Sequence, residues 1–113
     1  MNLEPRSLNG YTVIDIAGRI NRLKDSTALR AFVKGLLEKD TLRIAINLKE
    51  VSYLDSGALN VLIYCHNTLS KIGGNLVLFA PNHYVSDVLN VVGLDKIVKI
   101  FPSEEEFANG TVS

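Results

Sequence analysis

Apolar residues recur along this chain in two alternating patterns. Short, mostly apolar runs rich in β-branched residues predict strands at residues 11–17, 43–48, 75–80 and 97–101. Between them, apolar residues three or four positions apart predict helices at about residues 25–39, 56–71, 84–92 and 104–108. The alternation of strands with helices predicts an α/β fold whose sheet is mostly parallel and joined by right-handed crossovers.

The first strand has a predicted antiparallel neighbour. Asn9 and Gly10 are typical of a tight hairpin, so residues 3–8 are expected to pair with residues 11–17. Pro5 lacks a backbone N–H and therefore places residues 3–8 at an edge of the sheet. The sheet then has four to five strands, with an N-terminal hairpin and about four helices.

Polar residues between the apolar runs set the expected element ends. Residues 18–21 are predicted to break the strand, after which Asp25 or Ser26 caps the first helix. Residues 49–55 are predicted to form the turn before the second helix. We expect one domain over residues 1–113, with its core at about residues 3–108, because the chain is too short for two ordinary domains.

Composition narrows the functional classes. Hydrophobic residues make up 47% of the chain and charged residues 21%, which is typical of a globular protein. The 12 basic and 12 acidic residues give a formal net charge of +0, which argues against direct nucleic-acid binding. The single cysteine, Cys65, fits a reducing compartment, and we expect a cytoplasmic protein. No signal peptide or run long enough for membrane insertion is evident.

Motifs for catalysis, metals and cofactors are missing from the sequence. There is no P-loop or dinucleotide fingerprint, and His66 and His83 have no neighbours at metal-ligand spacing. We therefore expect no cofactor, no metal and no enzyme activity. A hydrolase that uses Ser56 is a minority hypothesis, since only the distant His83 offers a base. A small-ligand or nucleotide sensor also ranks low, because no glycine-rich phosphate cradle is visible.

The turn before the second predicted helix carries the most informative chemistry. Asp55 and Ser56 lie where an apolar strand meets an apolar helix. A helix N-terminus has unpaired N–H groups and a partial positive charge, so it suits a bound or covalently attached phosphate. In the simpler structural interpretation, either Ser56 or Asp55 is the N-cap of the helix.

This order of elements, together with the turn, resembles the STAS domain of anti-sigma factor antagonists. The resemblance covers about residues 3–108, and the Asp-Ser turn is its most specific part. The matching stretches are residues 44–48, 51–56, Leu59 with Val61 and Leu62, 73–78 and 88–97.

The resemblance implies a partner-switching mechanism. An antagonist of this family binds an anti-sigma factor that is also a serine kinase, and the sigma factor is released to regulate transcription. The kinase phosphorylates a hydroxyl at the start of the second helix, and a phosphatase reverses this. The resemblance also implies an alternative function, because related STAS domains serve as accessory subunits of lipid-transport ABC systems or as parts of stressosome-like assemblies.

One position departs from the family motif, Asp-Ser-Ser/Thr-Gly-Leu. With Asp55 and Leu59 in register, the usual phosphoacceptor position is Gly57, which has no hydroxyl, and Ala58 replaces the motif glycine. Either Ser56 takes over as the phosphoacceptor, or the protein binds its partner without this switch.

The predicted partner-binding surface combines the turn region at residues 51–60, the exposed face of helix 56–71 and the loop at residues 18–24. Its members are Asp55, Ser56, Gly57 and Asn60 from the turn and helix, and Arg19, Asn21 and Arg22 from the loop. A weak homodimer is left open.

Overall fold

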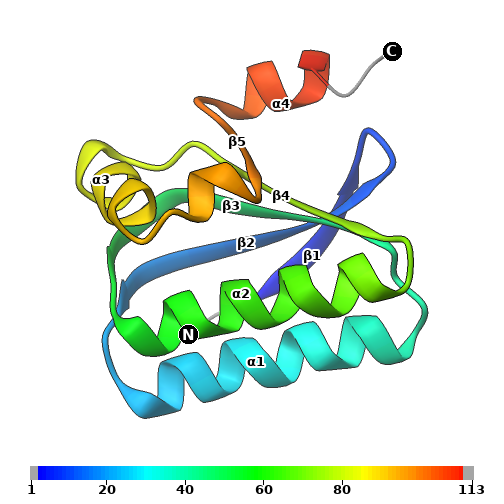
Figure 1. Ribbon diagram of the computed structural model, residues 1–113, viewed down its shortest axis with the longest axis horizontal. Helices are drawn as coiled ribbons and strands as arrows, with labels where there is room; N and C mark the ends of the chain where they lie inside the picture. The colour runs from blue at the N-terminus through cyan, green and yellow to red at the C-terminus, as the bar shows by residue number, and fades with distance from the viewer. Residues whose placement is uncertain (1–2, 111–113) are drawn as a thin grey trace.

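One five-stranded sheet organises the chain, in the order β1-β2-β3-β4-β5 (Figure 1). The computed structural model describes residues 3–110, so residues 1–2 and 111–113 of the expected domain lie outside the described residues. β1 pairs antiparallel with β2, and the other neighbours are parallel, as predicted. The strands are β1 (Glu4–Leu8), β2 (Tyr11–Ile20), β3 (Arg43–Leu54), β4 (Asn75–Phe79) and β5 (Lys99–Phe101).

Helices cover the two faces of the sheet unequally. α1 and α2 lie side by side on one face, and α3 packs into the same core (Figure 1). α4 lies on the opposite face. The helical segments are α1 (Leu23–Glu38), α2 (Ser56–Lys71), α3 (His83–Val91), the short 3-10 helix η1 (Leu94–Lys96) and α4 (Glu104–Gly110).

Strand β4 shows why its sequence is almost entirely apolar. Successive side chains of a strand point to opposite faces of the sheet. Leu76 and Leu78 enter the core beneath the helix pair, whereas Val77 and Phe79 enter the core beneath α4. The ring of Phe107 on α4 stacks on Phe79, with centroids 4.9 Å apart. β4 is therefore buried on both faces of the sheet from Leu76 to Phe79.

An ion-pair network fastens α4 to the N-terminal hairpin. Arg6 on β1 donates to Asp15 on β2 at 2.6 Å and to Glu104 on α4 at 2.7 Å. Asn47 on β3 donates to the same Asp15 carboxylate at 2.8 Å. The hydrogen bond from Arg6, supported by that from Asn47, lowers the pKa of the Asp15 carboxyl.

The predicted break at residues 18–21 is wrong, and so is the predicted end of the next strand at residue 48. β2 continues to Ile20 and β3 to Leu54, where the two residues pair. The β2–β3 register shifts between Asp15 and Ala17 and again between Gly18 and Arg19, each time with one extra residue on β3, and Gly18 adopts a positive φ of 94°. Residues that favour turns, such as Gly18, therefore lie within the paired strands and do not end them.

The start of the first helix also differs from the prediction. α1 begins at Leu23, and its N-cap, Arg22, makes no side-chain capping hydrogen bond. Asp25 and Ser26 lie inside the first turn and are buried, so neither is the cap. Further along, η1 delays the last strand, so β5 begins at Lys99 and not at residue 97. At α4 a serine does cap the helix, because the Ser103 hydroxyl accepts a hydrogen bond from the Glu106 N–H.

Two glycines provide a matched test of backbone packing. A Cβ at Gly74 would lie 2.4 Å from the Leu42 carbonyl oxygen, whereas a Cβ at Gly35 in α1 would meet nothing within 4 Å. Gly74→Ala is therefore expected to lower the free energy of unfolding by about 2 kcal/mol or more. Gly35→Ala is expected to raise it by about 0.5–1 kcal/mol, because alanine favours helix. Urea unfolding of both variants checks this, and equal effects would contradict the packing at Gly74.

The Arg6 network predicts a pH dependence of stability. The pKa of Asp15 in the folded protein lies below its ordinary value of 3.8, so the ionised carboxylate stabilises the folded state at pH values above 3.8. The contribution is lost as the pH falls through the lower folded pKa. We expect Asp15→Asn to be less stable than the parent at about pH 7 and to lose less stability on acidification to about pH 3. Asp95→Asn, at an exposed residue outside the network, is the control and should keep the parental profile. An unchanged acid response in Asp15→Asn would contradict the network.

Candidate functional site

The turn between β3 and α2 is closed by Asp55. Its backbone is extended, and its carboxylate Oδ1 accepts a hydrogen bond from the Ala58 N–H at 2.9 Å. Its carbonyl oxygen accepts from the Leu59 N–H at 3.1 Å. Asp55 is thus the N-cap of α2, and the alternative of a Ser56 cap is wrong. A carboxylate is favourable here because the helix N-terminus carries a partial positive charge.

A backbone hydrogen bond joins this turn to the end of β2. The Asp55 N–H donates to the Ile20 carbonyl at 2.9 Å. It brings residues 19–24, before and at the start of α1, next to the start of α2. We call the edge at which β2, β3 and β4 end the carboxyl edge, formed by residues 19–24, 53–60 and 82–84 (Figure 1).

Ser56 and Gly57 face different surroundings. Ser56 is the first residue of α2, is exposed, and its hydroxyl makes no hydrogen bond to any of the described residues. Gly57 is half-buried, and a Cβ there would lie 3.0 Å from Ser26 Oγ and 3.3 Å from Asp55 Oδ1. Ser26 is itself buried and donates to the Leu23 carbonyl at 3.2 Å. Position 57 therefore faces α1 and has little room for a side chain, whereas Ser56 faces solvent.

The remaining predicted residues lie along the same edge. Asn60 is exposed one turn after Ser56, so the two share a face of α2. Asn21 is exposed between β2 and α1, and Arg22 places its Nε 3.8 Å from an oxygen of Asp25. Thus the structure brings the predicted residues to one edge of the sheet.

Sequence reasoning missed the aromatic part of this edge. The Arg19 guanidinium lies over the Tyr53 ring, 4.8 Å from its centroid. Tyr53 in turn stacks on Tyr84 at the start of α3, with centroids 5.8 Å apart and ring planes 18° apart. No sequence signal relates Tyr53 to Tyr84, which lies 31 positions later in the chain. The contact of Arg19 with Tyr53 follows from the parallel register of β2 and β3, in which the two residues pair.

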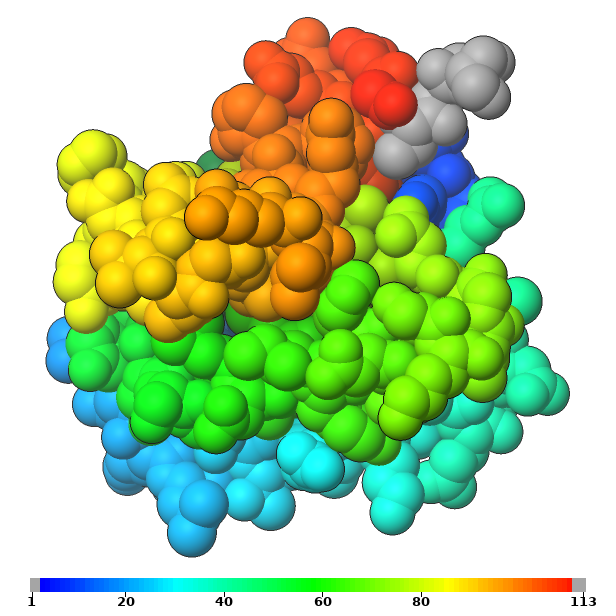
Figure 2. Space-filling view, viewed as in Figure 1, coloured from blue at the N-terminus to red at the C-terminus, as the bar shows by residue number. Residues whose placement is uncertain are grey.

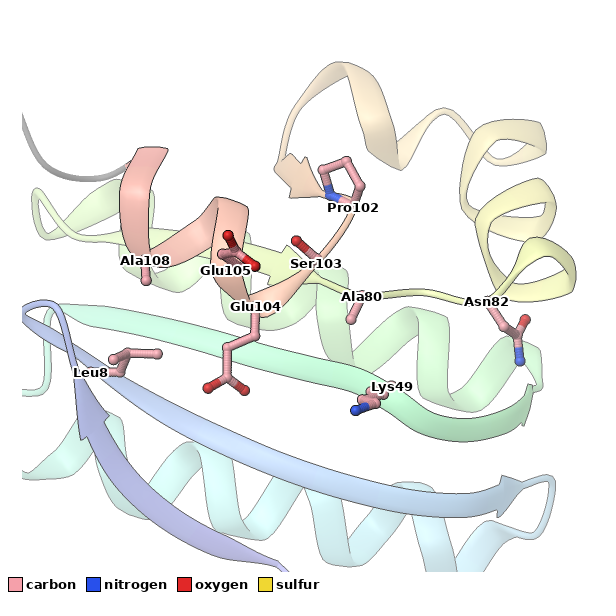
Figure 3. A pocket seen from close by; sticks show the side chains of 9 residues that line it. All are labelled: Leu8, Lys49, Ala80, Asn82, Pro102, Ser103, Glu104, Glu105 and Ala108. Atoms are coloured by element: carbon pink, nitrogen blue, oxygen red, sulfur yellow. The ribbon is translucent and has the colours of Figure 1, made fainter.

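A concave region lies between α4 and the sheet (Figure 3). It is an open groove of about 760 Å³. Glu104 points from α4 toward the strands, where its carboxylate is held by Arg6. The groove is lined by Leu8, Lys49, Ala80, Asn82, Pro102, Ser103, Glu104, Glu105 and Ala108.

Side chains suited to covalent or metal chemistry are not assembled in the part of the chain that the structure describes. Burial raises the pKa of the Cys65 thiol to about 12, so the thiol stays protonated near neutral pH. Within residues 3–110 no group of three His, Cys, Asp or Glu side chains is placed to hold a metal ion. Across the same residues, none of the helices is long and apolar enough to cross a membrane.

Comparisons with known proteins agree with this architecture. The family model described as STAS domain matches residues 2–107. A Thermotoga neapolitana protein, named as a candidate anti-sigma factor antagonist, is 36% identical over 70 residues. That match spans 62% of this chain and 62% of the length of the relative.

Solved structures show the same fold. A crystal structure of a candidate anti-sigma factor antagonist from Thermotoga maritima has a TM-score of 0.89 at 24% identity, covering 98% of this chain and 95% of that one. The Bacillus anti-sigma factor antagonist SpoIIAA has TM-scores of 0.76 unphosphorylated and 0.75 phosphorylated, both at 18% identity. These matches cover 98% and 96% of this chain, and 97% and 98% of the SpoIIAA chains. The predicted STAS-like α/β fold is confirmed.

The capping geometry predicts different effects for the two polar residues of the turn. Asp55→Ala is expected to lower the free energy of unfolding by about 1 kcal/mol, because the Ala58 N–H loses its acceptor. Ser56→Ala should change it by less than about 0.5 kcal/mol, because the hydroxyl is exposed and unbonded. Urea unfolding measures both, and a larger loss in Ser56→Ala than in Asp55→Ala would contradict this assignment of the cap.

Proposed function

The chain belongs to the STAS domain family, and from that premise we propose that it acts as an anti-sigma factor antagonist. It binds an anti-sigma factor that is also a serine kinase, and this binding releases a sigma factor in the cytoplasm. The observation that carries the proposal is the carboxyl edge. There Asp55 caps α2, Ser56 is left exposed, and a backbone hydrogen bond fastens the end of β2 beside them.

The chain acts in this proposal by binding, without catalysis of its own. Asp55, Ser56, Gly57 and Asn60 supply the part of the surface from α2 and its cap. Arg19 near the end of β2, and Asn21 and Arg22 after it, supply the other part. All seven lie at an edge with no buried catalytic pair, so recognition of a protein surface suits the geometry better than turnover of a small substrate.

Phosphorylation of Ser56 is the proposed off-switch. Its hydroxyl is reachable by a kinase, whereas Gly57 offers none and its Cβ position faces Ser26. A phosphate on Ser56 would add about −1.5 to −2 charges at the N-terminus of α2, where the helix tolerates negative charge. A partner fitted to the unmodified edge would then meet repulsion and a desolvation cost, and a phosphatase would restore binding.

A binding and phosphorylation assay tests both parts of the proposal. The chain is incubated with each anti-sigma factor encoded in its own genome, with and without ATP. Complex formation is followed by native mass spectrometry and modification by intact mass. We expect one anti-sigma factor to bind the parent and Ser56→Ala alike, and ATP to add the mass of one phosphate group only where Ser56 is present.

Ser52→Ala is the matched control, since Ser52 is exposed on β3 just before the turn. It should still gain the phosphate. Failure to bind any anti-sigma factor would contradict the antagonist role. A phosphate gained by Ser56→Ala would place the acceptor elsewhere and leave the binding role intact.

A further inference from the structure

Three side chains from three separate elements form a continuous row at the carboxyl edge. Arg19 from β2 covers one side of Tyr53 from β3, and Tyr84 at the start of α3 stacks on that ring. The Tyr53 and Tyr84 rings are thus held nearly parallel before any partner arrives, with the Arg19 guanidinium beside them. Rigid aromatic and arginine side chains of this kind dominate the energetics of many protein interfaces.

The row remains accessible although its members contact each other. Arg19 is exposed, Tyr53 is half-buried and Tyr84 is 47% exposed. Leu23, the first residue of α1, is 82% exposed at the same edge. Figure 2 shows the start of α3 in yellow, the β3–α2 turn in green and the β2–α1 segment in blue meeting at the left of the molecule. The edge thus offers both apolar area and ring hydroxyls to a partner.

Cationic side chains outnumber carboxylates, three to one, among the residues that form the edge, on a chain whose formal net charge is +0. α1, α2 and α3 each begin there, since they follow the carboxyl ends of parallel strands β2, β3 and β4 (Figure 1). Each helix start adds partial positive charge. The exposed cationic side chains at this edge are Arg19, Arg22 and Lys24.

Two of the cationic side chains at the edge, Arg19 and Lys24, are not paired with a carboxylate of the described residues. Buried Asp25 pairs with Arg22 and offsets its charge, and the carboxylate of Asp55 accepts a hydrogen bond from the Ala58 N–H. Asp87 is exposed one turn into α3, beyond the residues that form the edge. The positive charge of Arg19 and Lys24 is available to a partner.

We propose that the Arg19–Tyr53–Tyr84 row and Leu23 recognise an acidic segment of the anti-sigma factor that also carries an exposed apolar side chain. This deepens the proposed function and rests on it. Carboxylates of the segment meet Arg19, Lys24 and the helix N-termini, while its apolar side chain packs on Leu23 and Tyr84. Phosphate on Ser56 then opposes binding because it brings to the edge the same charge that the partner brings.

The chain contains a matched control for this row. Arg30 on α1 lies over the Tyr64 ring on α2, 4.1 Å from its centroid, in a second arginine–tyrosine pair away from the carboxyl edge. Arg19→Gln and Arg30→Gln therefore remove the same charge and the same kind of ring contact from two surfaces. Tyr84→Ala removes the outer ring of the row, and thermal unfolding of each variant confirms that it is folded.

The dissociation constant of each variant for the anti-sigma factor that binds the parent is measured by calorimetry at low and high NaCl. Arg19→Gln and Tyr84→Ala are each expected to weaken binding about tenfold, as interface anchors do, whereas Arg30→Gln leaves it unchanged. Parent affinity should fall with salt, and the fall should be smaller in Arg19→Gln.

Equal losses of affinity in Arg19→Gln and Arg30→Gln would overturn the proposal and would indicate that the partner also contacts the surface of α1 and α2 around Arg30 and Tyr64. Stronger binding at high salt would also overturn it, because an acidic partner would be held less tightly there. If the parent binds no anti-sigma factor, the proposed function fails and this recognition surface falls with it. If the parent binds and neither Arg19→Gln nor Tyr84→Ala weakens it, only the surface is wrong.

Discussion

The parallel pairing of β2 with β3, continued to Ile20 and Leu54, is the constraint on which the rest of the structure depends. Parallel strands end at the same edge of a sheet, so the helices that follow them begin there too. The hydrogen bond from the Asp55 N–H to the Ile20 carbonyl closes this arrangement. It places a capped helix start, an exposed serine and the cations that follow β2 on one surface.

Much of the architecture follows from sequence because local rules and burial agree. The periodicity of α2, the Asn9-Gly10 hairpin and the doubly buried β4 each reflect a single dominant signal. The ends of β2 and β3 could not be predicted in this way, because Gly18 and the polar residues Lys49 and Glu50 favour a turn when considered locally. Their strand conformation comes from pairing between segments distant in sequence. The stack of Tyr53 on Tyr84 is a tertiary contact of the same kind, so no local pattern indicated it.

Gly57 links the fold to the function. The residue that lacks the family hydroxyl is also the one whose Cβ position faces Ser26 on α1, at 3.0 Å from its hydroxyl oxygen. Close approach of α1 to α2 at this point therefore favours glycine, and the solvent-facing hydroxyl of the turn belongs to Ser56.

Mapping the interface on the labelled protein tests the central claim most directly. Backbone amide shifts are recorded by NMR while the anti-sigma factor that binds the chain is added. The account predicts that the largest changes fall at residues 19–24, 53–60 and 82–84. Changes concentrated instead on α4 and the groove beneath it, with the carboxyl edge unaffected, would contradict it.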